Sequence, residues 1–160
     1  MFDDSKYRSM TKISLPDSEY LFLLGISVSV FSSNVGFIIE NLGYTSEPMT
    51  WYKLTDLEAG RLRPKVKKYI AENFNEEIYD LYKSIVERRN RIIHGFRITS
   101  KENKQVLATK TKDKDNNKDG NKQFEITIEY LVEFIELNSK LSKLLDEFRE
   151  TILLQKRTMS

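Results

Sequence analysis

Two long stretches of the chain carry apolar residues at helical spacing, and this pattern limits the fold more than any other feature of the sequence. In the stretch around residues 75–94 the apolar side chains repeat at separations of three, four and seven: Phe74, Ile78, Leu81, Ile85, Ile92 and Phe96. In the last stretch they repeat in steps of four and three: Tyr130, Phe134, Leu137, Leu141, Leu144, Phe148 and Ile152. Both patterns predict long helices that bury one face.

Capping signals predict two further helices. Asp17 or Ser18 can cap a long helix that stops at Gly43. The segment 55–58 (TDLE) is typical of a capping box and predicts a short helix that breaks before Pro64. Three long helices and one short helix predict an all-α chain, a four-helix up-down bundle.

A polar insertion precedes the last helix. Residues 112–122 (KDKDNNKDGNK) are all polar and include a glycine, so we expect a flexible polar insertion at about 99–122. Residues 105–109 and 123–127, on either side of its tip, predict either a short hairpin or a loop insertion. The whole chain, 1–160, is expected to form a single domain.

The composition excludes several kinds of site. The chain has no cysteine and one histidine, which excludes disulfides, a Cys nucleophile and zinc sites built from several His or Cys residues. We therefore expect no metal and no cofactor, and a reducing, cytoplasmic setting. The net charge of +2 is too small to indicate nucleic-acid binding by itself, so any basic surface must be local.

One apolar run is long enough to span a bilayer. Residues Tyr20 to Ile39 are 20 consecutive residues without a charge. The run also holds four serines, an asparagine and two glycines, and it lacks a clear basic flank. We expect this run to form a buried helix of a bundle or of a dimer interface, with no membrane contact. The alternative is that it spans a membrane and that the protein is a membrane-associated regulator.

Arg89 lies inside the apolar stripe of the third predicted helix. On a helical wheel with Ile85 at zero, the stripe covers about −40° to +100° and Arg89 falls at about +40°. A buried guanidinium is costly unless it is paired, so this position requires an anion or an acidic partner. The partner is either a bound phosphate or a structural acid such as Glu40 or Glu129.

His94 and Asn90 lie near the end of the same helix. They are four residues apart, so Asn90 is placed to orient or assist His94. Arg89 and His94 diverge by about 140° in a regular helix. Gly95 permits unwinding at His94, and a second copy of the chain would also remove this geometric difficulty. The alternative reading of His94 is a surface residue at a helix end.

The segment Arg89-Asn90-Arg91-Ile92-Ile93-His94 resembles the signature of HEPN domains, in which an Arg and a polar residue precede a His late in a helix. The resemblance covers roughly residues 17–152. It implies a four-helix bundle and metal-independent RNA cleavage at a composite site in a homodimer. Many members are toxins or antiviral defence effectors, and a minority lack catalysis. Some toxins of the family carry a Tyr two residues after the His that a partner enzyme modifies; Phe96 stands there in this chain.

The predicted function is therefore an endoribonuclease. A neutral His94 would act as general acid and base on a ribose 2′-OH, while Arg89 would stabilise the charge on the phosphate. RNA, a second copy of the chain and a neutralising or regulatory protein are the expected partners. The alternative is a non-catalytic dimeric helical module that binds a partner protein or RNA.

The positions of further basic and aromatic residues also predict where they lie. The densest basic cluster is expected either to guide RNA or to form a solvated face: Arg61, Arg63, Lys65, Lys67 and Lys68. Arg88 and Arg91 are expected to be surface charges. Five aromatic residues are expected to pack in the core rather than stack on bases: Trp51, Tyr52, Tyr79, Tyr82 and Tyr130.

Overall fold

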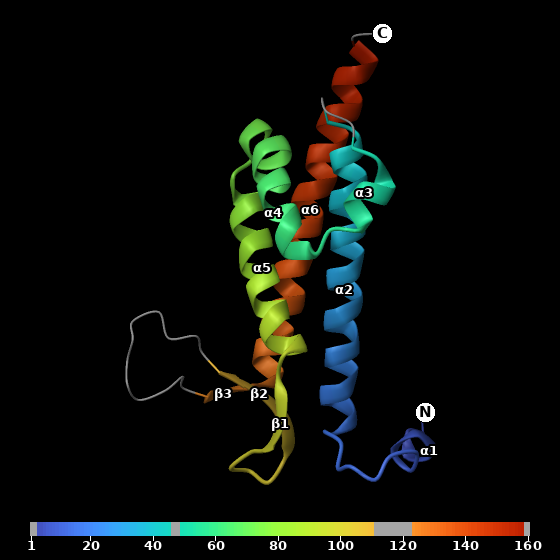
Figure 1. Cartoon of the computed structure of the whole chain (residues 1–160), viewed down its shortest axis with the longest axis vertical. Coiled ribbons are helices and arrows are strands. Elements are labelled where there is room, and N and C mark those ends of the chain that lie inside the picture. Colours follow the sequence, from blue (N-terminus) through green and yellow to red (C-terminus); the bar gives the residue numbers. More distant parts are fainter. Residues whose placement is uncertain (1–2, 46–48, 111–122, 159–160) are drawn as a thin grey trace.

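The computed structural model describes residues 3–45, 49–110 and 123–158 (Figure 1). The helices are α1 (Ser5–Arg8), α2 (Ser18–Gly43), α3 (Trp51–Thr55), α4 (Ala59–Lys65), α5 (Glu77–Ile93) and α6 (Ile128–Thr158). Between α4 and α5 the chain forms a π-helical turn, η1 (Val66–Ile70), and then a 3-10 turn, η2 (Ala71–Asn73). The strands are β1 (Phe96–Thr99), β2 (Gln105–Lys110) and β3 (Gln123–Ile126).

The prediction of an all-α four-helix up-down bundle is wrong. The protein is 71% helical, and its described residues form six helices and a small three-stranded antiparallel sheet. The helix predicted to end near His94 does end at Ile93, but Phe96, which continues its apolar spacing, begins β1. β1 forms because its residues find hydrogen-bonding partners in β2, which pairs Phe96 with Ala108.

The polar insertion is partly β structure. Of the segment expected at about 99–122, residues 99–110 contribute the end of β1, a turn and β2. The rest of the insertion, 111–122, lies outside the described residues. Residues 105–110 and 123–126 do pair as antiparallel strands, with Leu107 opposite Ile126.

The capping box predicted at residues 55–58 is also wrong. Thr55 ends α3, and α4 begins only after Glu58. The helix does not break before Pro64, which lies inside it. Proline has no N–H to donate to the carbonyl of Gly60, four residues earlier. That carbonyl instead accepts a hydrogen bond of 3.2 Å from Nε of Arg63, so the helix tolerates the proline.

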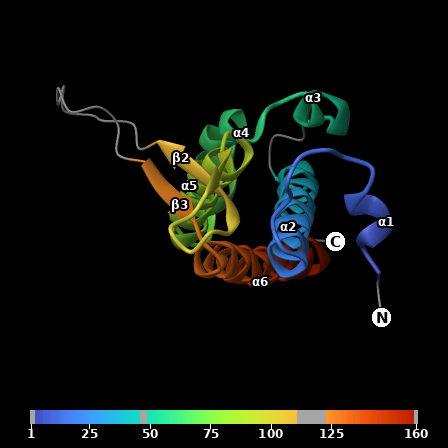
Figure 2. The ribbon, with the colours of Figure 1, turned by 90° about the horizontal axis from the view of Figure 1, so that it is seen from below.

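Three long helices form the body of the protein. α2 and α5 both pack against α6, and α3 and α4 cover the halves of α2 and α5 that lie away from the sheet (Figures 1 and 2). No described helix covers the halves nearer the sheet in the same way, so the apolar stripes of α2 and α5 end in exposed side chains there. Val28 is 48% exposed and Ile93 is 47% exposed.

The sheet is attached to the first long helix by one side chain. The hydroxyl of Tyr20 donates to the carbonyl of Ile126 at 2.7 Å and accepts from the N–H of Leu107 at 3.0 Å. Burial raises the pKa of this hydroxyl, so it stays protonated and can make both bonds. α2 is thereby fixed to both β2 and β3.

A pair of buried amides joins α2 to α6. Nδ2 of Asn34 donates to the carbonyl oxygen of Asn138 at 2.8 Å and to its Oδ1 at 3.0 Å. Nδ2 of Asn138 donates to the carbonyl of Phe134 at 2.9 Å. Buried amides need such partners, and shifting α2 by one turn along α6 would break them. The pair therefore fixes the register of the two helices.

α2 is the one described helix that is long and apolar enough to cross a membrane. Its most apolar stretch is only 28% buried in the protomer, although the helix packs along α6. Phe22, at 69% exposure, is among the side chains left open. The helix thus has a buried face against α6 and a second, uncovered apolar face.

We expect Asn34→Ala to lower the free energy of unfolding by about 1–3 kcal/mol, because it leaves Oδ1 of Asn138 buried without its donor. Ser33→Ala is the matched control, since Ser33 is exposed on the same helix and should change stability by less than about 0.5 kcal/mol. Urea denaturation followed by circular dichroism measures both. Equal stability of the two variants would contradict the role given to the amide pair.

Candidate active site

The C-terminal end of α5 places the three predicted catalytic residues. His94 is the C-cap of the helix, and its backbone N–H donates to the carbonyl of Asn90 at 3.0 Å. Gly95 follows, and a Cβ at that position would lie only 3.1 Å from the carbonyl oxygen of Ile92 and 3.2 Å from that of Arg91. A side chain would therefore be crowded by the backbone of α5 at the point where the chain leaves it for β1, which favours glycine there.

Arg89 is half-buried and faces α2. Its guanidinium carbon lies 5.4 Å from the centre of the Phe31 ring, and its Nη1 donates to Oδ1 of Asn90 at 3.2 Å. The Phe31 ring is itself buried against Phe134 of α6, with 6.4 Å between the ring centres. A cation over an aromatic face is attracted to the ring, so Phe31 holds the guanidinium in place.

No ion pair among residues 3–45, 49–110 and 123–158 includes Arg89. Of the two acids considered as structural partners, Glu40 lies 3.8 Å from Arg149, and Glu129 makes no ion pair with a described residue. The reading of Arg89 as one half of a buried ion pair is therefore wrong. Among the described residues no carboxylate forms an ion pair with it.

Asn90 contacts Arg89 with its side chain and His94 with its backbone. Oδ1 accepts from Arg89, while the carbonyl oxygen accepts from the N–H of His94. The sequence suggested a side-chain contact to His94 instead. In the protomer the amide of Asn90 positions the arginine, and its backbone positions the histidine.

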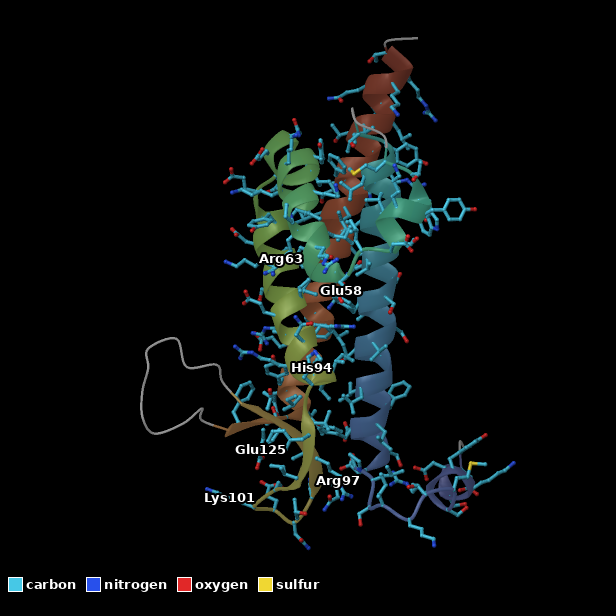
Figure 3. All side chains as sticks on the ribbon, viewed as in Figure 1. Glu58, Arg63, His94, Arg97, Lys101 and Glu125 are labelled. Carbon is cyan, nitrogen blue, oxygen red and sulfur yellow. The ribbon has the colours of Figure 1, made fainter. Side chains whose placement is uncertain are left out.

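The imidazole of His94 is exposed at the end of α5, next to the start of the sheet (Figure 3). It makes no side-chain hydrogen bond or ion pair with any residue of the described part of the chain. Arg89 and His94 therefore lie near each other in sequence but are not held together by a direct contact.

The two neighbouring arginines lie on the other flank of α5. Arg88 donates to both carboxylate oxygens of Glu133, at 3.0 and 2.8 Å, and lies 5.0 Å from the centre of the Tyr130 ring. Arg91 is exposed and lies 5.3 Å from the centre of the Phe124 ring. Burial raises the pKa of the Tyr130 hydroxyl, although the positive charges of both arginines lower it. These contacts engage Arg88 and Arg91 with α6 and β3, away from α2.

The predicted RNA-binding residues are spread over α4 and η1. Arg61 is exposed, and Arg63 is half-buried with its guanidinium 4.0 Å from Glu87. Lys65 is half-buried, while Lys67 and Lys68 are exposed and lie over the rings of Tyr79 and Tyr69. The five residues belong to α4 and η1, and Arg63 lies on the half of the molecule away from the sheet (Figure 3).

The aromatic residues divide between core and surface. Tyr82 is buried, as predicted, and its hydroxyl donates to the carbonyl of Ala59 at 2.8 Å. Tyr79 and Tyr130 are half-buried. The core prediction is wrong for Trp51 and Tyr52, which are 49% and 81% exposed, because the short helix α3 lies on the outside of α2.

The part of the chain that the structure describes holds no candidate metal centre. Its His, Asp and Glu side chains form no group of three or more that could hold a metal ion. The chemistry available at the end of α5 is that of an imidazole, a guanidinium and an amide.

Comparison with known proteins finds no match: no family model, no curated protein and no solved structure resembles the chain significantly. The resemblance to HEPN domains therefore rests on residues 89–94 and on their place at the end of a helix.

Proposed function

We propose that the protein is a metal-independent endoribonuclease of the HEPN type. The observation that carries the proposal is the state of Arg89: its guanidinium is half-buried over Phe31, has no carboxylate partner in the described residues and lies five residues before an exposed histidine. A partly desolvated arginine of this kind attracts an anion more strongly than a fully solvated one. An RNA phosphate is an anion of suitable charge and geometry.

The residues support a reaction without metal. The neutral imidazole of His94 takes the proton from a ribose 2′-OH, and the 2′ oxygen attacks the adjacent phosphorus. The bond to the 5′ oxygen breaks, and that oxygen receives a proton from an imidazolium. Arg89 stabilises the negative charge that builds up on the phosphate oxygens. The products are a 2′,3′-cyclic phosphate and a 5′-hydroxyl.

A second copy of the chain completes the site in this proposal. Val28 lies on α2 three residues before Phe31, and Ile93 lies on α5 four residues after Arg89, so both flank the arginine. They are about half exposed although they continue buried stripes. A twofold contact across this face would bury them and bring two Arg89 and two His94 side chains to one place. One imidazole would then accept a proton and the other donate one.

A ribonuclease of this type would act as a toxin or an antiviral defence effector and would need a neutralising or regulatory partner. Phe96 lacks the hydroxyl that a modifying partner would use two residues after the histidine. Control would therefore act by binding rather than by modification at that position.

We expect the purified protein to cleave single-stranded RNA in the presence of EDTA, because the nucleophile and the catalytic groups are all non-metal. Mass spectrometry of the products should show 2′,3′-cyclic phosphate ends. A substrate with 2′-deoxyribose at the cleavage position should resist, since it lacks the nucleophile. Activity that is lost on chelation and restored by magnesium would rule out this mechanism.

The proposal assigns different effects to three substitutions in α5. His94→Ala should lower the cleavage rate by about 10²-fold or more and leave the melting temperature nearly unchanged, because the side chain is exposed and unbonded. Arg89→Ala should abolish cleavage. Arg91→Ala is the matched control on the same helix and should retain cleavage, since its guanidinium lies over Phe124 instead.

Wild-type cleavage by His94→Ala, or equal damage from Arg91→Ala and Arg89→Ala, would overturn the assignment. If all variants and the wild type lack activity but dimerise, the protein is the non-catalytic helical module instead.

We expect a homodimer at micromolar concentration, held by the face that contains Val28. Val28→Lys should shift the protein to monomer in analytical ultracentrifugation and lower cleavage in parallel, because the contact would bury an added positive charge beside two Arg89 side chains. Val132→Lys is the control, since Val132 is exposed on α6. A Val28→Lys protein that stays dimeric, or a monomer with full activity, would contradict the composite site.

A further inference from the structure

Phe96 is an exposed aromatic residue beside the candidate active site. It is the first residue of β1 and stands two positions after His94, so the Cα atoms of the two residues are at most about 7 Å apart. The residue is 40% exposed. Opposite it in β2 lies Ala108, whose side chain is too small to cover a ring. A substrate held by His94 would therefore lie within reach of the Phe96 ring.

The Phe96 ring differs from three other rings that pack against α5. Each of those three has a guanidinium over one face, whereas Phe96 makes no ring contact and no cation contact with a described residue. Its exposed surface is thus open to a ligand. The three occupied pairs, with the distance from the guanidinium carbon to the ring centre, are Arg88 over Tyr130 at 5.0 Å, Arg89 over Phe31 at 5.4 Å and Arg91 over Phe124 at 5.3 Å.

The strand that carries Phe96 is held in place from two sides. β1 pairs with β2 along its length and forms one edge of the sheet. Side chains alternate between the faces of a strand, so Arg97 points away from Phe96. Nη1 of Arg97 donates to the carbonyl of Ser14, which ties β1 to the segment before α2; Figure 3 shows Arg97 and His94 where α5 passes into the sheet. The position of the Phe96 ring relative to His94 is thereby fixed.

The charge around Phe96 suits a negatively charged strand. The segment 88–97 (RRNRIIHGFR) has four arginines and no carboxylate. A second copy of the chain would bring the same positive charges to this place, whereas RNA brings phosphates of opposite charge. Glu125 of β3 lies opposite Ala108 on the same face of the sheet, two strand spacings from Phe96, or about 10 Å. Exposed aromatic rings among arginines are typical of surfaces that bind single-stranded nucleic acid.

We propose that Phe96 is the base-binding residue of the site and that its ring stacks on the base next to the phosphate engaged by Arg89 and His94. The inference rests on the proposed function, because it takes RNA as the ligand. Bases in a duplex are already stacked, so the site accepts a single-stranded segment. A purine offers a larger face than a pyrimidine, so a purine at this position binds more tightly.

The test measures binding by fluorescence anisotropy with short labelled 2′-O-methyl oligonucleotides, which lack the free 2′-OH and stay intact. Phe96→Ala should weaken the binding of oligoadenylate about tenfold, because a base loses its stacking partner. It should leave the binding of an abasic oligomer of the same length unchanged, since that oligomer has phosphates and no bases. Phe96→Tyr keeps a ring and should bind oligoadenylate as the wild type does. Tyr52→Ala is the matched control, because it removes a ring that is 81% exposed on α3.

The wild type should also bind oligoadenylate more tightly than oligouridylate, and Phe96→Ala should lose this preference. Absence of oligoadenylate binding by the wild type would overturn the proposal, as would equal binding by Phe96→Ala and Tyr52→Ala. Equal weakening of the abasic oligomer would show that the substitution acts through the fold and not through a base. Conversion of a dimer to monomer by Phe96→Ala in analytical ultracentrifugation would assign the ring to the contact between protomers instead.

The nuclease proposal fails by a different result. A wild type that binds oligoadenylate through Phe96 but does not cleave unmodified RNA would contradict the nuclease and leave the stacking contact in place. Cleavage by a protein whose binding does not depend on Phe96 would contradict the stacking contact alone.

Discussion

The contact between α2 and α6 is the interaction on which the candidate site depends. Asn34 and Asn138 fix the register of the two helices by hydrogen bonds within the interface. Phe31 lies one turn before Asn34, so the same register places its ring against Phe134 and under the guanidinium of Arg89. A one-turn shift would remove both the amide bonds and the aromatic support of the arginine.

The electrostatic state of Arg89 follows from that packing. An aromatic ring stabilises a cation without neutralising it, whereas a carboxylate would cancel its charge. The neighbouring Arg88 shows the alternative, because it is held by both oxygens of Glu133. Two arginines adjacent in sequence therefore differ in their contacts: Arg88 joins α5 to α6, and Arg89 keeps the charge that the proposed mechanism directs at a phosphate. The uncovered apolar side chains beside it, Val28 and Ile93, give the reason to expect a second copy of the chain over this face.

Local signals predicted the ends of the long helices well. Asp17 caps α2 by accepting from the N–H of Tyr20 at 2.9 Å, and α5 ends at the residue before His94. The unusual position of Arg89 was also visible, because a charge inside an apolar stripe can be read from spacing alone. The sequence could not show what would face that charge. The choice between an acid and an aromatic ring depends on how α2 packs against α5 and α6.

The features that sequence missed all depend on distant segments. β1 has only four residues, Phe96–Thr99, and forms because β2 supplies its hydrogen bonds. Trp51 and Tyr52 look like core residues, but the side of α2 on which α3 lies decides their exposure. A hollow of about 340 Å³ lies between the end of α2, the turns η1 and η2, and the second half of α6, three segments that no local pattern connects. Periodicity reports which face of a helix is apolar, and it does not report what covers that face.

The central claim is that two protomers together form one metal-free site around Arg89 and His94. The most direct test is the initial rate of RNA cleavage in EDTA as a function of protein concentration, measured below the dissociation constant of the dimer. The rate should rise with the square of the protein concentration, and it should become linear once the dimer is saturated. A rate that is linear throughout that low range would show that a single protomer cleaves RNA, and it would contradict the composite site.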